Sequence, residues 1–247
     1  MGQPYFSGFL YNWQLKSGSC SGKIPKILQR EVIPEQFLYV FSEATVKILL
    51  SAVIAYVLGS ASFSIVLSRL MYRKDVRGEG SGNAGATNMA RSFGKLAGAL
   101  TLLGDVLKTV AAVLIGKALA GDWGVIVACL GCQIGHCFPA YHHFKGGKGV
   151  AVGLAITAMV DWRITVTVLV VFILTAVLSK KISLASILAT FSAIPAAVLV
   201  IHDWRYLCMV AVAASIIIFR HKENISRLMK GEEKDFHFGD EKKGKKK

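Results

Sequence analysis

The feature that most constrains this chain is the apolar run VKILLSAVIAYVLGSASFSIVL, from Val46 to Leu67, which contains a single lysine. A run of about 20 apolar residues is long enough to cross the hydrocarbon core of a bilayer as a helix. Further apolar stretches follow it, and only 18% of the residues are charged, against about 25% in soluble domains. The pattern predicts an all-α, polytopic membrane protein.

Seven apolar segments can be placed along the chain, joined by short polar connections. The fourth segment is short for a complete span, but seven spans make the distribution of charge consistent across all the connections. We therefore expect about seven transmembrane helices. The predicted segments cover residues 46–70, 96–120, 123–141, 149–160, 164–179, 182–201 and 204–219.

The connections are of two kinds, and together they predict the orientation of the chain. One set, with the C-terminal stretch, is basic and holds 20 of the 29 Lys and Arg residues. The other set has Asp followed by Trp, at Asp122, Asp161 and Asp203. Cytoplasmic loops collect positive charge, and Trp concentrates at membrane interfaces. We therefore expect a cytoplasmic C-terminus and an outside N-terminus, and the net charge of +14 needs no nucleic-acid partner.

The two ends of the chain do not share this pattern. Residues 1–45 are Gly- and Ser-rich in part and lack the order of a signal peptide. We expect an extension that is dispensable, or that is not made because translation begins at Val46. Residues 46–233 would then form the membrane domain, and residues 234–247 a basic, disordered tail that contacts lipid headgroups.

The first polar cluster on the predicted cytoplasmic face is GEGSGNAGATNMAR, from Gly78 to Arg91. Glycines allow backbone amides to approach an anion, and Ser, Thr and Asn side chains add further donors. Arg91 can add a bidentate contact to a phosphate or carboxylate. The cluster is a candidate anion site, and the alternative is a flexible loop rich in turn-forming residues.

The second cluster is HHFKGGKGVAV, in which Gly146, Gly147 and Gly149 surround Lys148 before an apolar run. A glycine-rich backbone that opens onto a helix N-terminus is a general arrangement for binding phosphate. The stretch is not a Walker A loop, because Gly149 follows the lysine and His142 stands where that motif needs glycine. ATP hydrolysis is therefore disfavoured, and the alternative is a tight turn with a solvated lysine.

The third cluster, RHKENISRLMKGEE, places His221 and Asn224 three residues apart, and so on one face of a helix. Inside the second span, Asp105 and Lys108 have the spacing of an ion pair, which we expect to lie beneath the site. We expect His136 to orient the glycine loop rather than to act as a base.

Small residues within the third span have packing roles in this interpretation. Cys129 and Cys132 have C-x-x-C spacing, but no second ligand pair follows, so we expect them to pack in the core. Gly131 and Gly135 have the G-x-x-x-G spacing that allows close helix packing, either within one chain or between subunits.

The stretches GSGNAGATNMAR, GHCFPAYHHFKGGKGVAV and RHKENISRL, in this order, resemble the acyl-phosphate-dependent glycerol-3-phosphate acyltransferases of the bacterial inner membrane, the PlsY family. The resemblance covers residues 46–233. It implies a membrane enzyme that transfers an acyl group from acyl phosphate to the 1-position of glycerol 3-phosphate. The products would be lysophosphatidic acid and phosphate, in the first step of phospholipid synthesis at the cytoplasmic face.

The resemblance also implies which residues act, with acyl phosphate, glycerol 3-phosphate and membrane lipids as partners and with no cofactor or metal. Lys148 and the glycine loop would hold acyl phosphate and stabilise the transition state, while Arg91, His221 and Asn224 would hold glycerol 3-phosphate. The implied catalytic residues are Ser81, Arg91, Lys148, His221 and Asn224, and the implied substrate-binding residues are Ser81, Asn83, Thr87, Arg91, Gly146, Gly147, Lys148, Gly149, His221 and Asn224.

Two alternatives remain open at this point. The hydroxyl proton of glycerol 3-phosphate could pass to a substrate phosphate or to His221, and base catalysis by His221 would give an activity that titrates near the ordinary histidine pKa. The same spans, glycines and cations would also fit a membrane transporter for glycerol 3-phosphate or phosphate. Transporters commonly contain repeated halves and a midplane site, and the sequence shows neither pattern.

Overall fold

The computed structural model describes residues 42–236, and every regular element in this range is helical. The prediction of an all-α fold is confirmed. Most of the predicted extension 1–45 and of the predicted tail lies outside the described residues. The α-helices are α3 (Glu43–Ser60), α4 (Phe63–Tyr72), α5 (Ala86–Phe93), α6 (Lys95–Cys137), α7 (Val150–Val160), α8 (Trp162–Ser179), α9 (Ile182–Val200), α10 (Trp204–Arg220) and α11 (Lys222–Met229).

Several of these helices are long and apolar enough to cross a membrane, as the sequence predicts. Within the described part, four candidates pass by length and composition, and a fifth is added if α10 and α11, bent by 57°, count as one broken span. α7 is apolar but has only 11 residues, which at 1.5 Å per residue reach about half of the hydrocarbon thickness. The polytopic membrane class is confirmed, while seven complete spans remain a prediction.

Helix α6 is two helical arms that reverse direction at Ala120 and Gly121. Both residues have non-helical backbone angles, and Gly121 has a φ of 57°. On the two sides of this reversal, the backbones of Gly116 and Gly124 lie so close together that a Cβ on either residue would overlap the carbonyl oxygen of the other. The second and third predicted segments are therefore the two arms of a helical hairpin.

The first predicted segment, residues 46–70, lies within one candidate span, Glu43–Tyr72, but the helix is interrupted inside it. α3 ends at Ser60, and α4 begins at Phe63 after two non-helical residues. α3 packs closely along the second arm of α6, where a Cβ on Gly135 would lie 2.3 Å from the Tyr56 carbonyl oxygen. The G-x-x-x-G spacing therefore serves packing within one chain.

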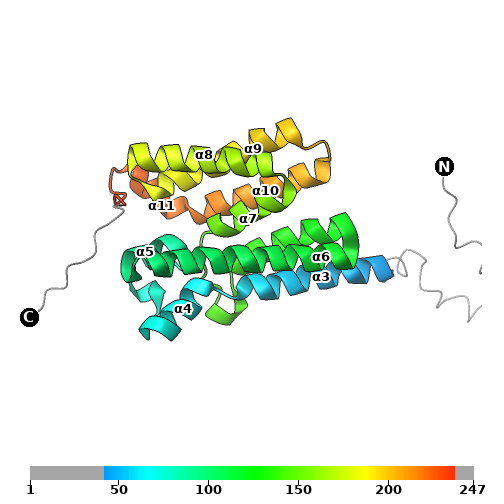
Figure 1. Cartoon of the computed structure of the whole chain (residues 1–247), viewed down its shortest axis with the longest axis horizontal. Helices are drawn as coiled ribbons and strands as arrows, with labels where there is room; N and C mark the ends of the chain where they lie inside the picture. Colours follow the sequence, from blue (N-terminus) through cyan, green and yellow to red (C-terminus); the bar gives the residue numbers. More distant parts are fainter. Residues whose placement is uncertain (1–41, 237–247) are drawn as a thin grey trace, which may run out of the picture. The chain divides into compact units, whose positions relative to one another are not determined.

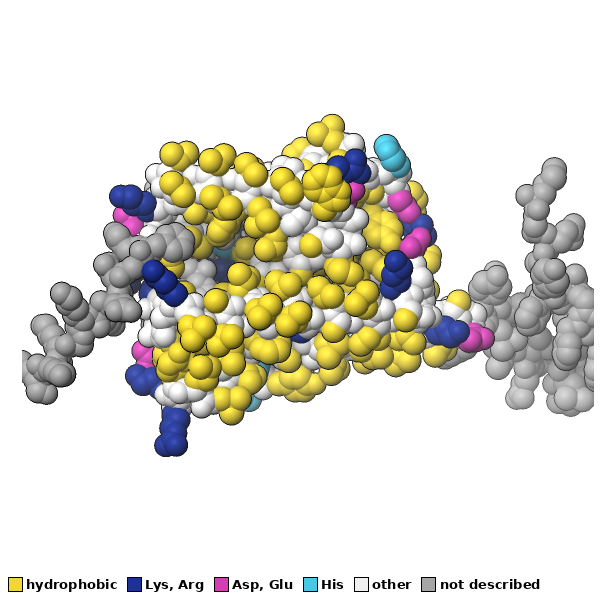
Figure 2. Space-filling model, in the orientation of Figure 1, with side chains coloured by type: hydrophobic (Ala, Val, Ile, Leu, Met, Phe, Trp, Pro, Cys, Tyr) yellow, Lys and Arg dark blue, Asp and Glu magenta, His cyan; other side chains and the backbone are white. Residues whose placement is uncertain are grey.

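Figure 1 shows the helices in two layers, with α3 and α6 in one and α8, α9 and α10 in the other. The short helix α7 lies between the layers and contacts α6, α8 and α10. Figure 2 shows hydrophobic side chains over the visible flank of the bundle, with charged side chains gathered toward its two ends. This distribution is typical of a protein whose flank faces lipid.

Two of the three Asp-Trp turns meet at one end of the bundle. Asp122 accepts a hydrogen bond of 3.2 Å from the Tyr206 hydroxyl, and the Arg205 guanidinium lies 5.3 Å from the ring centre of Trp123. The aspartates at 161 and 203 also cap the helices that follow them, because each carboxylate accepts the backbone N–H two residues later. These two Asp-Trp turns are therefore helix starts as well as connections.

Candidate active site

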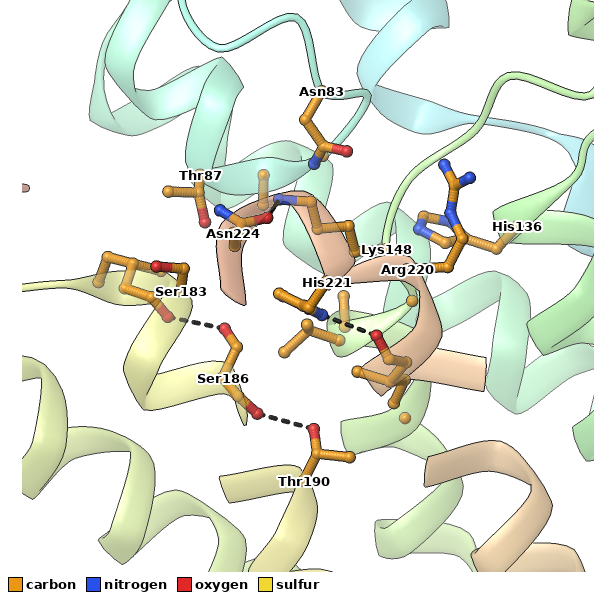
Figure 3. A pocket seen from close by; sticks show the side chains of 18 of the residues that line it. Asn83, Thr87, His136, Lys148, Ser183, Ser186, Thr190, Arg220, His221 and Asn224 are labelled. Carbon is orange, nitrogen blue, oxygen red and sulfur yellow. Dashed lines mark hydrogen bonds between the residues drawn. The ribbon is translucent and has the colours of Figure 1, made fainter. Parts of the chain in front are cut away.

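A cavity of about 1270 Å³ joins the three polar clusters to an apolar channel between helices. Its polar end is formed by the loop before α5, the glycine loop before α7, the start of α9 and α11 (Figure 3). The apolar end runs between α7, α8, α9 and α10. Nine of the ten predicted substrate-binding residues line the cavity, namely Ser81, Asn83, Thr87, Arg91, Gly146, Lys148, Gly149, His221 and Asn224.

The loop before α5 is shaped by Asn88, a residue that the sequence did not single out. Its side chain is 1% exposed, and its Oδ1 accepts a 2.8 Å hydrogen bond from the backbone N–H of Ser81. The two N–H groups of its Nδ2 are shared among the carbonyls of Val76, Glu79 and Asn83, at 2.9–3.0 Å. One buried amide thus satisfies four backbone groups and fixes the loop that carries Ser81 and Asn83.

Replacing Asn88 with Ala is expected to destabilise the protein and lower its activity together. The change leaves one N–H and three carbonyls without this partner, and an unsatisfied buried polar group costs about 1–3 kcal/mol. Thermal unfolding in detergent and steady-state turnover measure the two effects. Asn83→Ala is the comparison, because it removes a predicted substrate-binding side chain but leaves the Asn88 bonds in place, so it should lower turnover without lowering the unfolding temperature. Wild-type unfolding and turnover in Asn88→Ala would contradict this role.

The glycines of the second cluster let the loop lie directly against the end of α6. A Cβ on Gly146 would lie 2.1 Å from the His136 carbonyl oxygen, and one on Gly147 would lie 2.4 Å from His136 Nε2. Gly149 has a φ of +85°, and its Cβ would meet Gln133. Gly147 does not line the cavity, and its N–H donates to the His136 carbonyl at 3.1 Å, so its substrate-binding role stays a prediction.

Arg220 is a second residue that the sequence reasoning missed, although it begins the third motif. Its Nη2 donates to the Gly146 carbonyl at 3.0 Å, and its Nε donates to the Gly147 carbonyl at 3.1 Å. The guanidinium also lies 5.1 Å from the ring centre of Phe138. Arg220 therefore ties the glycine loop to the end of α10 and adds positive charge to the polar end.

Beneath the glycine loop, the ion pair expected from the spacing of Asp105 and Lys108 is present at 2.8 Å. The Lys108 ammonium also donates to the carbonyls of Gly59 and Ala61, at 3.1 and 2.7 Å, and lies 3.1 Å from His136 Nδ1. The break between α3 and α4 leaves carbonyls without helical partners, and a membrane interior offers no water to satisfy them. Lys108 supplies that partner, and Asp105 balances its charge.

His136 lies between this ion pair and the loop, as the sequence reasoning expected. Its ring is 3% exposed, and the backbone of Gly147 packs against its Nε2. The other ring nitrogen faces Lys108 and Asp105. His136 therefore supports the loop from below.

Lys148 and Asn224 meet at the centre of the polar end (Figure 3). The Lys148 ammonium donates to Asn224 Oδ1, and Asn224 is 4% exposed. Burial lowers the pKa of Lys148 to about 8. The ammonium thus stays mostly protonated at pH 7 and has two more N–H groups to offer to an anion.

His221 is held as a neutral acceptor rather than as a cation. Its Nδ1 lies 2.8 Å from the Ile217 carbonyl, so this nitrogen must carry the proton and Nε2 must be the acceptor. The side chain is 2% exposed, and burial lowers its pKa to about 4. The neutral ring can orient a hydroxyl group, but it is a weak base at neutral pH.

Helix α9 contributes hydroxyl groups that the sequence reasoning also missed. Ser183, Ser186 and Thr190 line the cavity one helical turn apart and are at most 9% exposed (Figure 3). Ser186 and Thr190 donate to carbonyls one turn earlier, at 2.9 and 2.7 Å. In the sequence they stand within an apolar span, where their spacing gave no sign of a common site.

Cations, amides and hydroxyls at a helix end, opening into an apolar channel, form a site whose chemistry suits phosphate groups and a lipid chain together. The family model described as "Glycerol-3-phosphate acyltransferase" matches residues 49–231. The chain belongs to the glycerol-3-phosphate acyltransferase family.

Individual relatives agree with this assignment. The chain is 38% identical over 187 residues to a glycerol-3-phosphate acyltransferase of Carboxydothermus hydrogenoformans, which covers 75% of this chain and 95% of that protein. It is 40% identical over 192 residues to the enzyme of Pseudomonas putida, covering 76% and 98%. The crystal structure of PlsY (YgiH), an integral membrane glycerol 3-phosphate acyltransferase, in its glycerol 3-phosphate form is similar with a TM-score of 0.73 and 36% identity, covering 77% of this chain and 96% of that one. Its lysophosphatidic acid form gives a TM-score of 0.71 and 35% identity, covering 77% and 95%.

Proposed function

We propose that this protein transfers a fatty acyl group from acyl phosphate to the 1-hydroxyl of glycerol 3-phosphate. The products are lysophosphatidic acid and inorganic phosphate, and the reaction is the first step of phospholipid synthesis. The observation that carries the proposal is a single cavity that joins a cationic end around Lys148 to an apolar channel. Both substrates carry phosphate, and only one of them carries an acyl chain, so the reaction needs both environments in contact.

The chemistry asks for positioning and charge stabilisation more than for a strong base. The hydroxyl oxygen attacks the acyl carbon, the bond from that carbon to the phosphate oxygen breaks, and phosphate leaves. Lys148 faces the charge that develops, and Arg91 and Asn224 orient glycerol 3-phosphate. With its pKa lowered to about 4, His221 accepts a hydrogen bond from the hydroxyl, and the proton passes to the departing phosphate.

We further propose that the protein lies in the bacterial inner membrane with this site facing the cytoplasm. The basic loops supply residues of the polar end, including Arg77, Arg91 and Lys148. Cytoplasmic loops of membrane proteins carry the excess of Lys and Arg. Glycerol 3-phosphate would then enter from the cytoplasm, and the acyl donor from the bilayer.

The apolar channel is expected to measure acyl chain length, and Ala193 is the last residue of α9 that lines it. Ala193 lies ten residues beyond Ser183, which is about 15 Å along a helix. Ala193→Leu fills this space, and excluding two methylenes forfeits about 1.6 kcal/mol, or roughly 15-fold. Comparing kcat/KM for palmitoyl phosphate and lauroyl phosphate should show a selective loss with the longer donor.

The matched control for this prediction is Val198→Leu, on the same helix but 61% exposed and outside the cavity. It should change neither donor. Equal losses with both donors in Ala193→Leu would mean that this position does not limit chain length.

Reconstituted liposomes test the proposed reaction against transport. Protein in vesicles is given labelled glycerol 3-phosphate with and without palmitoyl phosphate. The proposal predicts labelled lysophosphatidic acid only when both substrates are present. Uptake of glycerol 3-phosphate that needs no acyl phosphate, with no lipid product, would favour the transporter instead.

A further inference from the structure

The carboxylate of Glu233, in the segment that follows α11, lies against the centre of the site. Although its neighbours in sequence are exposed, its side chain is only 11% exposed. Its Oε1 accepts a 2.7 Å hydrogen bond from Asn224 Nδ2, and its Oε2 accepts one of 2.7 Å from Arg227 Nε. A carboxylate from the last described residues is thus bonded directly to an amide of the candidate active site.

These bonds leave the Asn224 amide only one orientation. An ammonium group can only donate hydrogen bonds, and a carboxylate can only accept them. The Asn224 oxygen must therefore face Lys148, and its nitrogen must face Glu233. Without Glu233 the amide could rotate and turn its N–H groups toward the Lys148 ammonium. An ammonium group cannot accept a hydrogen bond, so the bond between Lys148 and Asn224 would then be lost.

The segment that carries Glu233 is held in place by the turn between α8 and α9. The Lys181 ammonium donates to the Glu233 carbonyl at 2.9 Å and to Asp235 Oδ1 at 2.8 Å. The backbone N–H of Phe236 donates to the Lys180 carbonyl at 2.7 Å. Hydrogen bonds to the basic pair at 180–181 therefore extend through Phe236, the last described residue, while the disordered tail expected from residue 234 onward stays a prediction.

We propose that Glu233 is a positioning residue for the acyl transfer. It orients the Asn224 amide, whose oxygen then holds the Lys148 ammonium at the wall of the cavity. The proposal rests on the proposed function for its kinetic readout. Glu233 also lines the cavity, but in this proposal it acts through Asn224 rather than on the reacting atoms. Arg227 holds the other carboxylate oxygen and so fixes the plane of the group.

Glu233→Gln tests the proposal, because glutamine keeps the size of the side chain but has one oxygen where glutamate has two. It therefore cannot accept a hydrogen bond from Asn224 on one oxygen and from Arg227 on the other. We expect kcat/KM to fall about 10- to 100-fold, as misplacement of a positioned group by about 1 Å does. In an Asn224→Ala background the same change should have no further effect, because Glu233 acts through that amide. The control is Glu232→Gln, an exposed neighbour that should behave as wild type.

A second readout is independent of activity. Lys148 is flanked by Glu233 and Glu223, whose charges raise its pKa, and by Arg227 and Arg220, whose charges lower it, while His221 beside it is neutral. Removing the Glu233 charge should lower the pKa of Lys148 further, measured as the pH dependence of acetylation of Lys148 by mass spectrometry. Glu233→Asp keeps the charge on a shorter side chain, so activity should fall while the labelling curve stays near wild type.

Three results would overturn the proposal. One is an equal fall in kcat/KM from Glu233→Gln in the wild-type and the Asn224→Ala backgrounds, as a general structural role would give. Another is a lower KM for glycerol 3-phosphate in Glu233→Gln, which would mean that the carboxylate occupies the place of a substrate phosphate. The third is an unchanged labelling curve for Lys148. Inactive wild-type protein with the expected labelling shift would instead reject the proposed reaction and leave the contact intact.

Discussion

Lys148→Ala is expected to reduce kcat about 10²- to 10³-fold, the loss seen when one group that stabilises transition-state charge is removed. The side chain stands at the polar end of the cavity, held by Asn224, and its ammonium is the group best placed to face a departing phosphate. The measurement is steady-state release of phosphate from palmitoyl phosphate in the presence of glycerol 3-phosphate. The protein should remain folded, because Lys148 lies in a loop, outside the helices that form the fold.

Lys145→Ala is the matched control, since it removes a lysine from the same loop whose side chain is exposed. Its turnover should stay near that of the wild type. If both variants lose the same activity, the loop acts through its total charge and Lys148 has no special place. If Lys148→Ala keeps most of its kcat, charge stabilisation by this residue is wrong.

Asp105→Ala is expected to cause the largest loss of stability in the molecule, about 3–5 kcal/mol, because it leaves a buried charge without its partner. The side chains of Asp105 and Lys108 are 2% and 4% exposed. At this pair the first arm of α6 meets the break between α3 and α4. Thermal and denaturant unfolding in detergent measure the change. Lys108→Met in the same background should recover part of the loss, because the unpaired charge is then gone.

Asp161→Ala provides the comparison for this prediction. It removes an aspartate that caps α8 at an exposed turn, and losing such a cap costs about 1 kcal/mol. Equal destabilisation by Asp105→Ala and Asp161→Ala would show that the buried pair is not what holds the break between α3 and α4.

The apolar runs predicted the helical fold because a span of that length is a local property of the sequence. The break after Ser60 was not predictable in the same way. Residues 61 and 62 are small and do not interrupt the apolar pattern. The break depends on Lys108, 47 residues away from Ala61, which satisfies the carbonyls that the break exposes. A partner so distant in sequence leaves no local signal.

The same distinction applies to the candidate site. Residues that face the cavity stand in dense polar motifs, and nine of the ten predicted substrate-binding residues line it. Residues that act on those motifs were missed, because Asn88, Arg220 and Glu233 bond to partners brought together only by folding. The hydroxyls of α9 were missed because Ser and Thr are ordinary in an apolar span. The packing of Gly147 against His136 is likewise a contact between separate segments that the sequence does not show.

The most direct test of the whole account is the reaction of purified protein with palmitoyl phosphate and glycerol 3-phosphate, followed by mass spectrometry of the lipid product. We expect 1-palmitoyl-glycerol 3-phosphate and one phosphate released for each acyl group transferred, with little product from Lys148→Ala. Palmitoyl-CoA in place of palmitoyl phosphate should give no product. Transfer from palmitoyl-CoA at an equal rate, or no lysophosphatidic acid from palmitoyl phosphate, would contradict the account.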